Sequence, residues 1–148
     1  MRGAWTLLLV AAALSACSGG SSPSFPGRVV FETSRGPVEL HVAFAQSEQE
    51  RQHGLMDRPS LPPDTGMAFA WSEPTEANFW MKDTLIPLSI AFVGADARII
   101  AIREMRPCWV DPCAVYRAPG PYTLAIEANA DWFAGNRVRE GDVARVET

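Results

Sequence analysis

The sequence is short of positive charge, and of lysine in particular. Twelve arginines accompany a single lysine, Lys82, and basic residues never form a run. Proteins that bind nucleic acid or anionic lipid headgroups carry clustered basic side chains, which this chain lacks. A formal net charge of −4 at pH 7 points the same way. Nucleic acid is therefore not an expected partner.

Common catalytic motifs are also missing. The chain has neither a Gly-x-Ser-x-Gly nucleophile elbow nor a His-Glu-x-x-His zinc motif. Its two histidines, His41 and His53, fall on an expected strand and an expected helix with no nucleophile nearby in sequence. A glycosidase pair, formed by Glu127 with Asp83 or Asp142, stays open as an alternative that the spacing does not support. We expect no metal site and no cofactor.

The N-terminus has the features of a lipoprotein signal. Arg2 supplies a positive charge, and the apolar segment 6–14 is too short to span a bilayer as a helix. Residues 14–17 (LSAC) then predict a signal peptide over 1–16 and a lipid anchor on Cys17. The alternative is an ordinary secretory signal that leaves Cys17 free. We expect a membrane-anchored protein on the periplasmic side of the cell envelope, and Ser18 favours the outer membrane of a Gram-negative cell.

A tether and one globular domain follow the signal. Residues 17–27 are rich in Ser, Gly and Pro, which gives a flexible segment that reaches roughly 15–20 Å. Residues 28–148 show no internal repeat and no change of composition, so they predict a single domain. Without the signal peptide, 12 basic and 17 acidic side chains remain, a net charge of −5.

Two cysteines remain besides Cys17. Cys108 and Cys113 are separated by four residues, and in an oxidising compartment such a pair predicts a disulfide that stabilises the fold by about 2 kcal/mol. A redox-active pair, which normally has two intervening residues, and a metal-ligand pair are the alternatives. Trp109 lies inside this loop and is a candidate contact for a partner protein or a glycan, unless its ring folds back over the bridge.

Short apolar runs predict a β-rich fold. A helix is expected over 46–56, where Ser47 and Glu50 match a capping box, and a helical turn over 131–136. The class is mainly β (α+β): a compact, barrel-like antiparallel domain with one flanking helix and a short C-terminal helical turn. The expected strands, with hairpin turns at 34–37 and 94–96, are 28–33, 38–44, 67–71, 78–82, 88–93, 98–103, 122–127 and 143–146.

The central segment resembles a known family. The residues that carry the resemblance are Gly54-Leu55-Met56, Arg58, Leu61, Gly66-Met67, Phe69, Phe79-Trp80-Met81-Lys82, Thr84, Pro87, Leu88, Ile90 and Phe92, followed by Met105, Pro107, both cysteines, Tyr116, Glu127 and Gly141-Asp142. Together they resemble domain of unknown function 192 over residues 29–146. The resemblance implies a small β-rich envelope protein without an established activity. Asp83 stands where this family usually has Asn, and Ser89 where it commonly has Asp, which weakens any mechanism that needs a carboxylate there.

Lys82 is the first candidate for a binding site. It lies between Trp80 and Thr84 in an apolar, aromatic stretch, where desolvation would lower its pKa. Glu127 is its expected partner, and Arg58 beside a proline suits carboxylate or phosphate recognition. The alternative is a structural Lys82–Glu127 pair with Arg58 fixing a turn. The candidate ligand-binding residues are therefore Trp80, Lys82, Thr84, Arg58 and Glu127.

The methionines offer a second hypothesis, a copper(I) site. Their wide spacing and apolar neighbours favour core packing instead. The residues concerned are Met56, Met67, Met81 and Met105, with His53. Our main prediction is a lipid-anchored, non-enzymatic binding or accessory module for a small anionic ligand or an envelope protein. The alternatives are an envelope saccharide- or peptide-processing enzyme that uses Lys82 and Glu127, and a periplasmic copper-handling protein.

Overall fold

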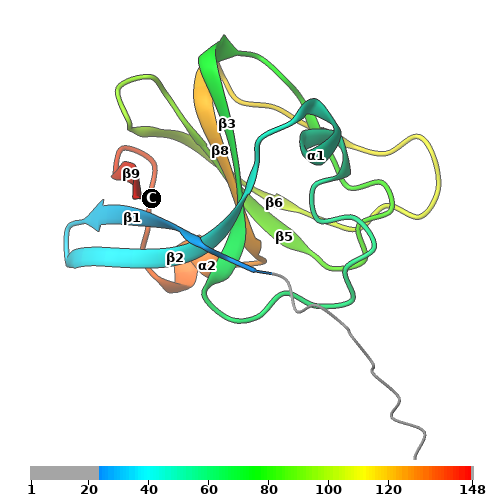
Figure 1. Ribbon diagram of the computed structural model, residues 1–148, viewed down its shortest axis with the longest axis horizontal. Coiled ribbons are helices and arrows are strands. Elements are labelled where there is room, and N and C mark those ends of the chain that lie inside the picture. Colours follow the sequence, from blue (N-terminus) through cyan, green and yellow to red (C-terminus); the bar gives the residue numbers. More distant parts are fainter. Residues whose placement is uncertain (1–23, 148) are drawn as a thin grey trace, which may run out of the picture.

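The computed structural model describes residues 24–147, so the predicted signal peptide and Cys17 lie outside the described residues (Figure 1). Seven strands form one sheet in the order β6-β5-β8-β3-β2-β1-β9, and β4 and β7 form a separate pair. Within this part of the chain, no helix has the length and apolar character needed to cross a membrane. The elements are β1 (Gly27–Thr33), β2 (Gly36–Ala45), α1 (Glu48–His53), β3 (Thr65–Thr75), β4 (Phe79–Trp80), β5 (Leu88–Val93), β6 (Ile99–Met105), β7 (Val115–Tyr116), β8 (Tyr122–Asn129), α2 (Trp132–Gly135) and β9 (Val143–Glu147).

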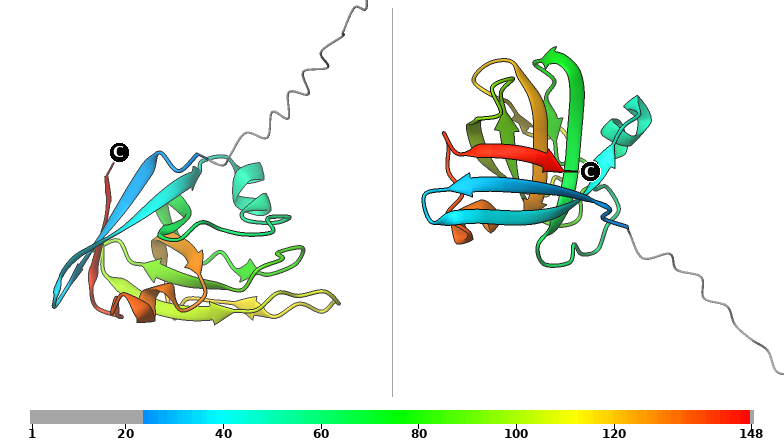
Figure 2. Two further views of the ribbon diagram at one scale, coloured as in Figure 1. Left: turned by 90° about the horizontal axis from the view of Figure 1, so that it is seen from below. Right: turned by 60° about the vertical axis from the view of Figure 1, so that its left-hand side comes forward.

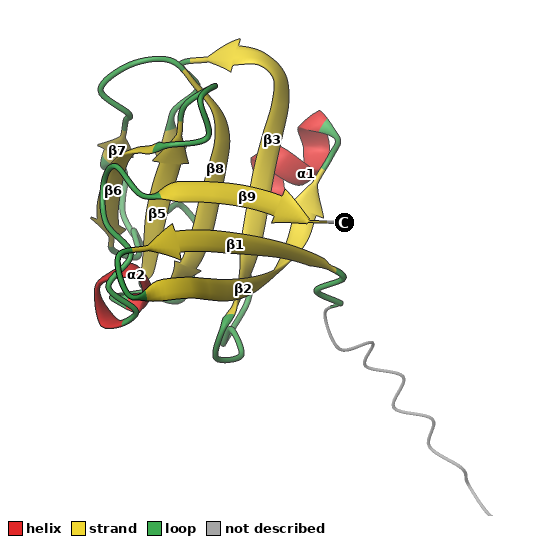
Figure 3. Cartoon of the chain, turned by 90° about the vertical axis from the view of Figure 1, so that its left-hand side faces the viewer, coloured by secondary structure: helices red, strands yellow, loops and turns green. Residues whose placement is uncertain are grey.

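The large sheet curls into a half-barrel. Strands β9, β1 and β2 cross over one face of β5, β8 and β3 (Figures 2 and 3). The right-handed twist between neighbouring strands accumulates over seven strands and produces this curl. An isolated bridge between Arg98 and Val143 joins the two edges of the sheet at one end. The predicted barrel-like, mainly β fold with two short helices is thus confirmed.

One strand pairing differs from the prediction. The strands were expected to be antiparallel throughout, but β2 and β3 pair in parallel, with Val42 opposite Gly66. A parallel pair needs a crossover connection of about a dozen residues or more, and residues 46–64, which include α1, supply it. The helix is shorter than expected, although Ser47 and Glu50 do form the capping box.

Alternating side chains divide the core into two clusters on opposite faces of the sheet. Along β5, which is buried throughout, Ala91 and Val93 face one cluster and Leu88, Ile90 and Phe92 the other. The inner cluster lies under β1, β2 and β9 and comprises Val29, Phe31, Leu40, Val42, Ala68, Ala91, Val93, Ile99, Leu124, Ile126, Ala128, Trp132, Phe133, Val138 and Ala144. The outer cluster comprises Ala45, Leu55, Leu61, Met67, Phe69, Met81, Leu88, Ile90, Phe92, Ala101, Met105, Tyr122 and Ala125.

Candidate functional site

A pocket of about 610 Å³ opens on the outer face of the sheet. One side of it is formed by α1 and the loop that follows, and the other by β3 and β4. Four aromatic side chains contribute to the wall, and two carboxyls lie among the polar lining groups. The lining residues are Glu48, Arg51, Gln52, His53, Gly54, Leu55, Met56, Phe69, Trp71, Thr75, Ala77, Asn78, Phe79, Trp80, Thr84 and Glu127.

The capped helix α1 positions the charged rim of the pocket. The Arg51 guanidinium donates to Glu48 Oε2 at 3.2 Å and to the carbonyl of Gln46 at 2.9 Å. It also lies 5.7 Å from the centre of the Trp71 ring. Arg51 is therefore satisfied by its own helix and by one aromatic wall, and Glu48 neutralises its charge.

Edge-to-face contacts hold the aromatic wall. The Phe79 ring centre lies 5.1 Å from that of Phe69 and 6.5 Å from that of Trp71, and Trp71 lies 5.4 Å from Tyr122. The Tyr122 hydroxyl donates to the carbonyl of Ala77 at 2.6 Å, and burial raises the pKa of this phenol. Such aromatic pairs stabilise by about 0.5–1.5 kcal/mol beyond the area they bury, so the wall is preformed.

Glu127 closes the inner end of the pocket. It is directly opposite Met67 on β3 and Ile90 on β5, and its side chain faces the outer cluster because Ile126 and Ala128 face the inner one. The residue is only 5% exposed. Within residues 24–147 no donor is hydrogen-bonded to its carboxyl, and desolvation alone raises its pKa to about 8. A buried carboxyl that keeps its proton near neutral pH is a common feature of functional sites.

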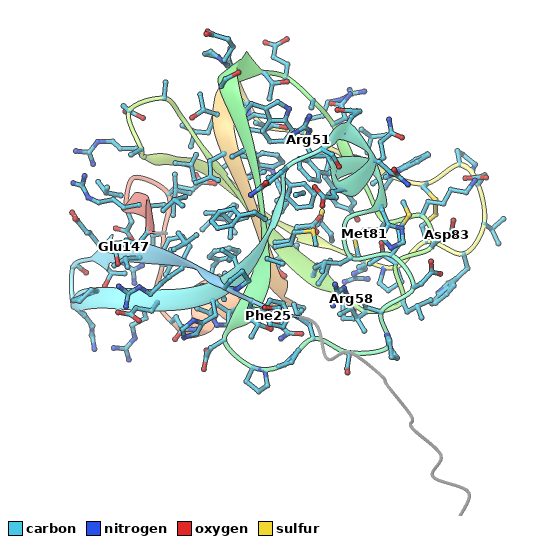
Figure 4. All side chains as sticks on the ribbon, viewed as in Figure 1. Phe25, Arg51, Arg58, Met81, Asp83 and Glu147 are labelled. Atoms are coloured by element: carbon cyan, nitrogen blue, oxygen red, sulfur yellow. A yellow bond between two sulfur atoms is a disulfide. The ribbon has the colours of Figure 1, made fainter. Side chains whose placement is uncertain are left out.

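The structure brings only three of the five predicted ligand residues to this pocket. Trp80, Thr84 and Glu127 line it, whereas Lys82 and Arg58 do not. Arg58 lies well below α1 on the side of Phe25, far from the labelled Arg51 (Figure 4). The acidic residue in an apolar strand, Glu127, was therefore a better guide to the pocket than the unusual lysine.

Lys82 has a different partner from the one expected. Its Nζ lies 2.8 Å from Asp111 Oδ2, on the disulfide loop, and its side chain is 39% exposed. The hydrogen bond to Asp111 raises the pKa of Lys82, the direction opposite to the predicted effect of desolvation. The ammonium also lies 5.9 Å from the centre of the Trp80 ring. The expected Lys82–Glu127 pair does not form, because Lys82 pairs with Asp111 on the disulfide loop whereas Glu127 lines the pocket.

The two departures from the family pattern both lie away from the pocket. Asp83 is exposed and has φ of 56°, a conformation that Asp and Asn share, so either residue suits the turn. Ser89 is buried on the inner side, where its hydroxyl donates to Glu104 at 2.6 Å and accepts from the Asp131 N–H at 2.8 Å. Glu104 thus supplies the carboxylate that residue 89 lacks.

The disulfide loop forms a separate surface. Cys108 and Cys113 are joined with an S–S distance of 2.08 Å. Trp109 is 69% exposed, so its ring does not fold back to become buried over the bridge. Val110 and Val115 are exposed on the same loop segment. The predicted partner contact at Trp109 stays a prediction.

The methionines mostly pack in the core. Met67, Met81 and Met105 belong to the outer cluster, and Met56 lines the pocket. Among residues 24–147, no group of three His, Cys, Asp or Glu side chains is placed to hold a metal ion. The copper hypothesis rests on these methionines and stays a prediction.

Several pocket residues were not predicted from the sequence. Arg51, Trp71 and Phe79 contribute to its wall. Trp71 and Phe79 do have a signal, since aromatic side chains commonly line ligand pockets. Arg51 has none, because its role depends on where the crossover places α1.

The structure is that of a small β-rich domain, a half-barrel with a pocket on its outer face. The model of the uncharacterised family DUF192 (Uncharacterized ACR) matches residues 29–146. The chain belongs to this family, as the sequence resemblance predicted. No curated protein matches the sequence.

Two solved structures share the fold. A protein of unknown function from Novosphingobium aromaticivorans is 31% identical, with a TM-score of 0.74 over 80% of this chain and 83% of that one. A protein from Sinorhizobium meliloti, described as a putative transcription regulator, is 30% identical, with a TM-score of 0.76 over 84% of this chain and 97% of that one.

Proposed function

We propose that the protein is a lipid-anchored binding module of the cell envelope, and that a small molecule binds in the pocket above Glu127. The unpartnered carboxyl of Glu127 is the observation that supports this function. Buried polar groups normally have a hydrogen-bond partner, and Glu127 has none among residues 24–147. Its carboxyl oxygens are open to the pocket rather than sealed inside the protein, so a ligand that enters the pocket can supply the partner. The pocket volume of about 610 Å³ is in the range typical of small-molecule sites.

The composition of the wall supports binding rather than catalysis. Apolar and aromatic residues make up half of the lining and polar residues the other half, four of them on α1. A combination of apolar contact area with a few polar groups that orient the ligand is usual in a binding pocket. The alternative enzyme needed Lys82 and Glu127 together, and Lys82 pairs with Asp111. The anionic ligand expected from the sequence depended on Lys82 and Arg58, and neither lines this pocket.

Chemical-shift mapping of the full chain against a fragment library of mixed charge tests the pocket. Bound fragments should shift the amides of Leu55, Phe69 and Thr84. A Met56→Trp substitution, which fills the pocket from its partly buried wall, should abolish these shifts, while Val146→Trp on the exposed face of β9 should not. Shifts that persist in Met56→Trp, or that map to the Trp109 loop, would contradict the proposal.

The anchor rests on the LSAC sequence at residues 14–17. Cys17→Ser should move the protein from the membrane fraction to the soluble fraction of the source cell, because a Ser hydroxyl cannot take the thioether-linked lipid. Metabolic labelling with a fatty-acid analogue gives the direct readout. Equal labelling of the two variants would contradict the anchor without affecting the pocket.

A further inference from the structure

The pocket contains one ionisable group, Glu127, that has no compensating partner among residues 24–147. Glu48 and Arg51 form an ion pair at its rim, with Nη2 of Arg51 3.2 Å from Oε2 of Glu48. His53 lies on the exposed side of α1, and the strands on either side of Glu127 present Met67 and Ile90, which carry no charge. Ionised Glu127 would therefore give the interior of the pocket a negative charge that no described side chain balances.

The aromatic walls favour a positive charge as well. The face of an aromatic ring carries a negative potential that attracts cations, most strongly for Trp. The protein's own cations already use two of these faces, with Arg51 5.7 Å from the centre of Trp71 and Lys82 5.9 Å from that of Trp80. Both cations lie at the margins of the site, which leaves the Glu127 end of the pocket for a ligand.

The pocket is unfavourable for an anionic ligand. Its charge would be repelled by Glu127 once that group ionises, and no unpaired Lys or Arg lines the pocket to compensate, since Arg51 is bound to Glu48. A neutral ligand would form only neutral hydrogen bonds with protonated Glu127, by accepting from its O–H or donating to its carbonyl oxygen. A cation gains a charge-assisted contact with the carboxylate and a cation–π contact with the wall.

We infer that the pocket binds an organic ammonium cation, with the charged head beside Glu127 and the apolar part against Trp71 and Phe79. This inference rests on the proposed function, because it assigns a ligand class to the same pocket. Glu127 must release its proton when the cation binds, since only the carboxylate compensates the charge. Its raised pKa, about 8, places this release in an accessible pH range.

Three probes of one shape test the charge. Choline is the cation, 3,3-dimethyl-1-butanol is its neutral isostere and 3,3-dimethylbutanoate is the anion. Titration calorimetry of the full chain at pH 9 should give choline an affinity at least about tenfold above that of either other probe, equivalent to 1.4 kcal/mol or more. The affinity for choline should fall roughly tenfold per pH unit below about 8, as the protonated form comes to dominate.

Glu127→Gln isolates the carboxylate from the shape of the pocket. The amide keeps the size of the side chain, so the variant should fold, bind the neutral isostere as the wild type does, and lose its preference for choline. Glu73→Gln, on the exposed end of β3 outside the pocket, should keep the wild-type preference. Calorimetry in two buffers of different ionisation enthalpy should detect close to one proton released per choline bound at pH 7.

Four results would overturn the inference. Equal affinities for choline and its neutral isostere, unchanged in Glu127→Gln, would assign the pocket to neutral ligands. Tighter binding of the butanoate would assign it to anions. Binding of choline without proton release would show that the Glu127 carboxylate does not compensate the charge of the cation. Failure of all three probes, when fragments of other chemistry still shift Leu55 and Thr84, would reject the ammonium class and leave the proposed binding function intact.

Discussion

The two faces of the same sheet carry different kinds of core. On the inner face the rings of Phe31, Trp132 and Phe133 pack with centres 5.3–5.7 Å apart, and the one buried polar side chain described on this face, Ser89, is hydrogen-bonded to Glu104. On the outer face a pocket lies between α1 and strands β3 and β4, and the buried carboxyl of Glu127 has no hydrogen-bond partner within residues 24–147. The closed face supplies stability, and that stability allows the open face to keep a costly group. This difference between the two faces is consistent with the binding function proposed above for the outer face.

Removing an aromatic ring from each face should have the largest effect on stability. Phe31→Ala leaves a cavity in a closed cluster and should lower the free energy of unfolding by roughly 3–5 kcal/mol. Phe79→Ala, at the pocket wall, should cost only about 1–2 kcal/mol because that ring already borders open space. Urea denaturation measures both. Equal losses would mean that the outer face is packed as tightly as the inner one.

The pH dependence of Glu127 should have the next largest effect. Its folded pKa, about 8, lies above the ordinary 4.5, so its contribution to stability is fully present below pH 4.5 and is lost as the pH rises to about 8. The full difference corresponds to about 5 kcal/mol, and hydration through the open pocket should reduce it to roughly 2–4 kcal/mol. Glu127→Gln should therefore be more stable than the wild type at pH 9 by that amount and similar to it at pH 4.

Denaturation curves at pH 4, 7 and 9 would measure this difference. Glu73→Gln provides the control, because it changes an exposed carboxylate on β3, the strand next to β8. Its free energy of unfolding should equal that of the wild type at every pH. A Glu127→Gln variant that loses stability at pH 9 would show that the carboxylate is stabilised within the fold, contrary to the geometry described above.

Opening the disulfide should have a smaller effect. Replacing both Cys108 and Cys113 by Ser removes the restraint that a short loop places on the unfolded chain and should cost about 2 kcal/mol. The loop borders the outer face only, since Cys108 packs against the outer cluster. Amide exchange should therefore accelerate around residues 106–118 and stay unchanged in β1 and β9. Faster amide exchange in β1 as well would show that the two faces unfold as one cooperative unit.

Neutralising Lys82 should have the smallest effect. The Lys82–Asp111 pair is exposed, and such pairs contribute little to stability because water competes for both charges. Lys82→Met should keep the melting temperature within about 2 °C of the wild type. Asp111→Asn removes the same pair from the other side and should match it. A fall of about 10 °C in both variants would make this pair a structural element of the outer face.

The sequence predicted local structure better than it predicted which elements come together. Period-two patterns located the strands, and Ser47 with Glu50 located the start of α1, because both signals arise from neighbouring residues. The parallel pairing of β2 with β3 was missed, since it depends on the path of the crossover. Strand β7, two residues long, is too short to leave a pattern.

The same limit applies to the site. Glu127 was identified because an acidic residue interrupts an apolar strand, and this is a local signal. Its predicted pairing with Lys82 was wrong, because the spacing of two residues along the sequence does not determine the distance between their side chains in the fold. Lys82 lies in a turn whose neighbour Asp83 has positive φ, and its ammonium reaches the disulfide loop instead. Arg58 is beside a proline, as the sequence shows, but the last residue of this segment that lines the pocket is Met56.

The bridge between Arg98 and Val143 affects how readily the sheet edges of one molecule pair with those of another at high protein concentration. An open sheet offers unpaired backbone groups at its first and last strands, and these invite strand addition by a neighbouring chain. Here the N–H of Ile99 donates to the carbonyl of Asp142, and the N–H of Ala144 donates to that of Ala97, which engages both margins at one end. Arg145 and Glu147 add exposed charge along β9. We therefore expect the margins of the sheet to resist strand addition by a neighbouring chain at this end, although the barrel is not completely closed.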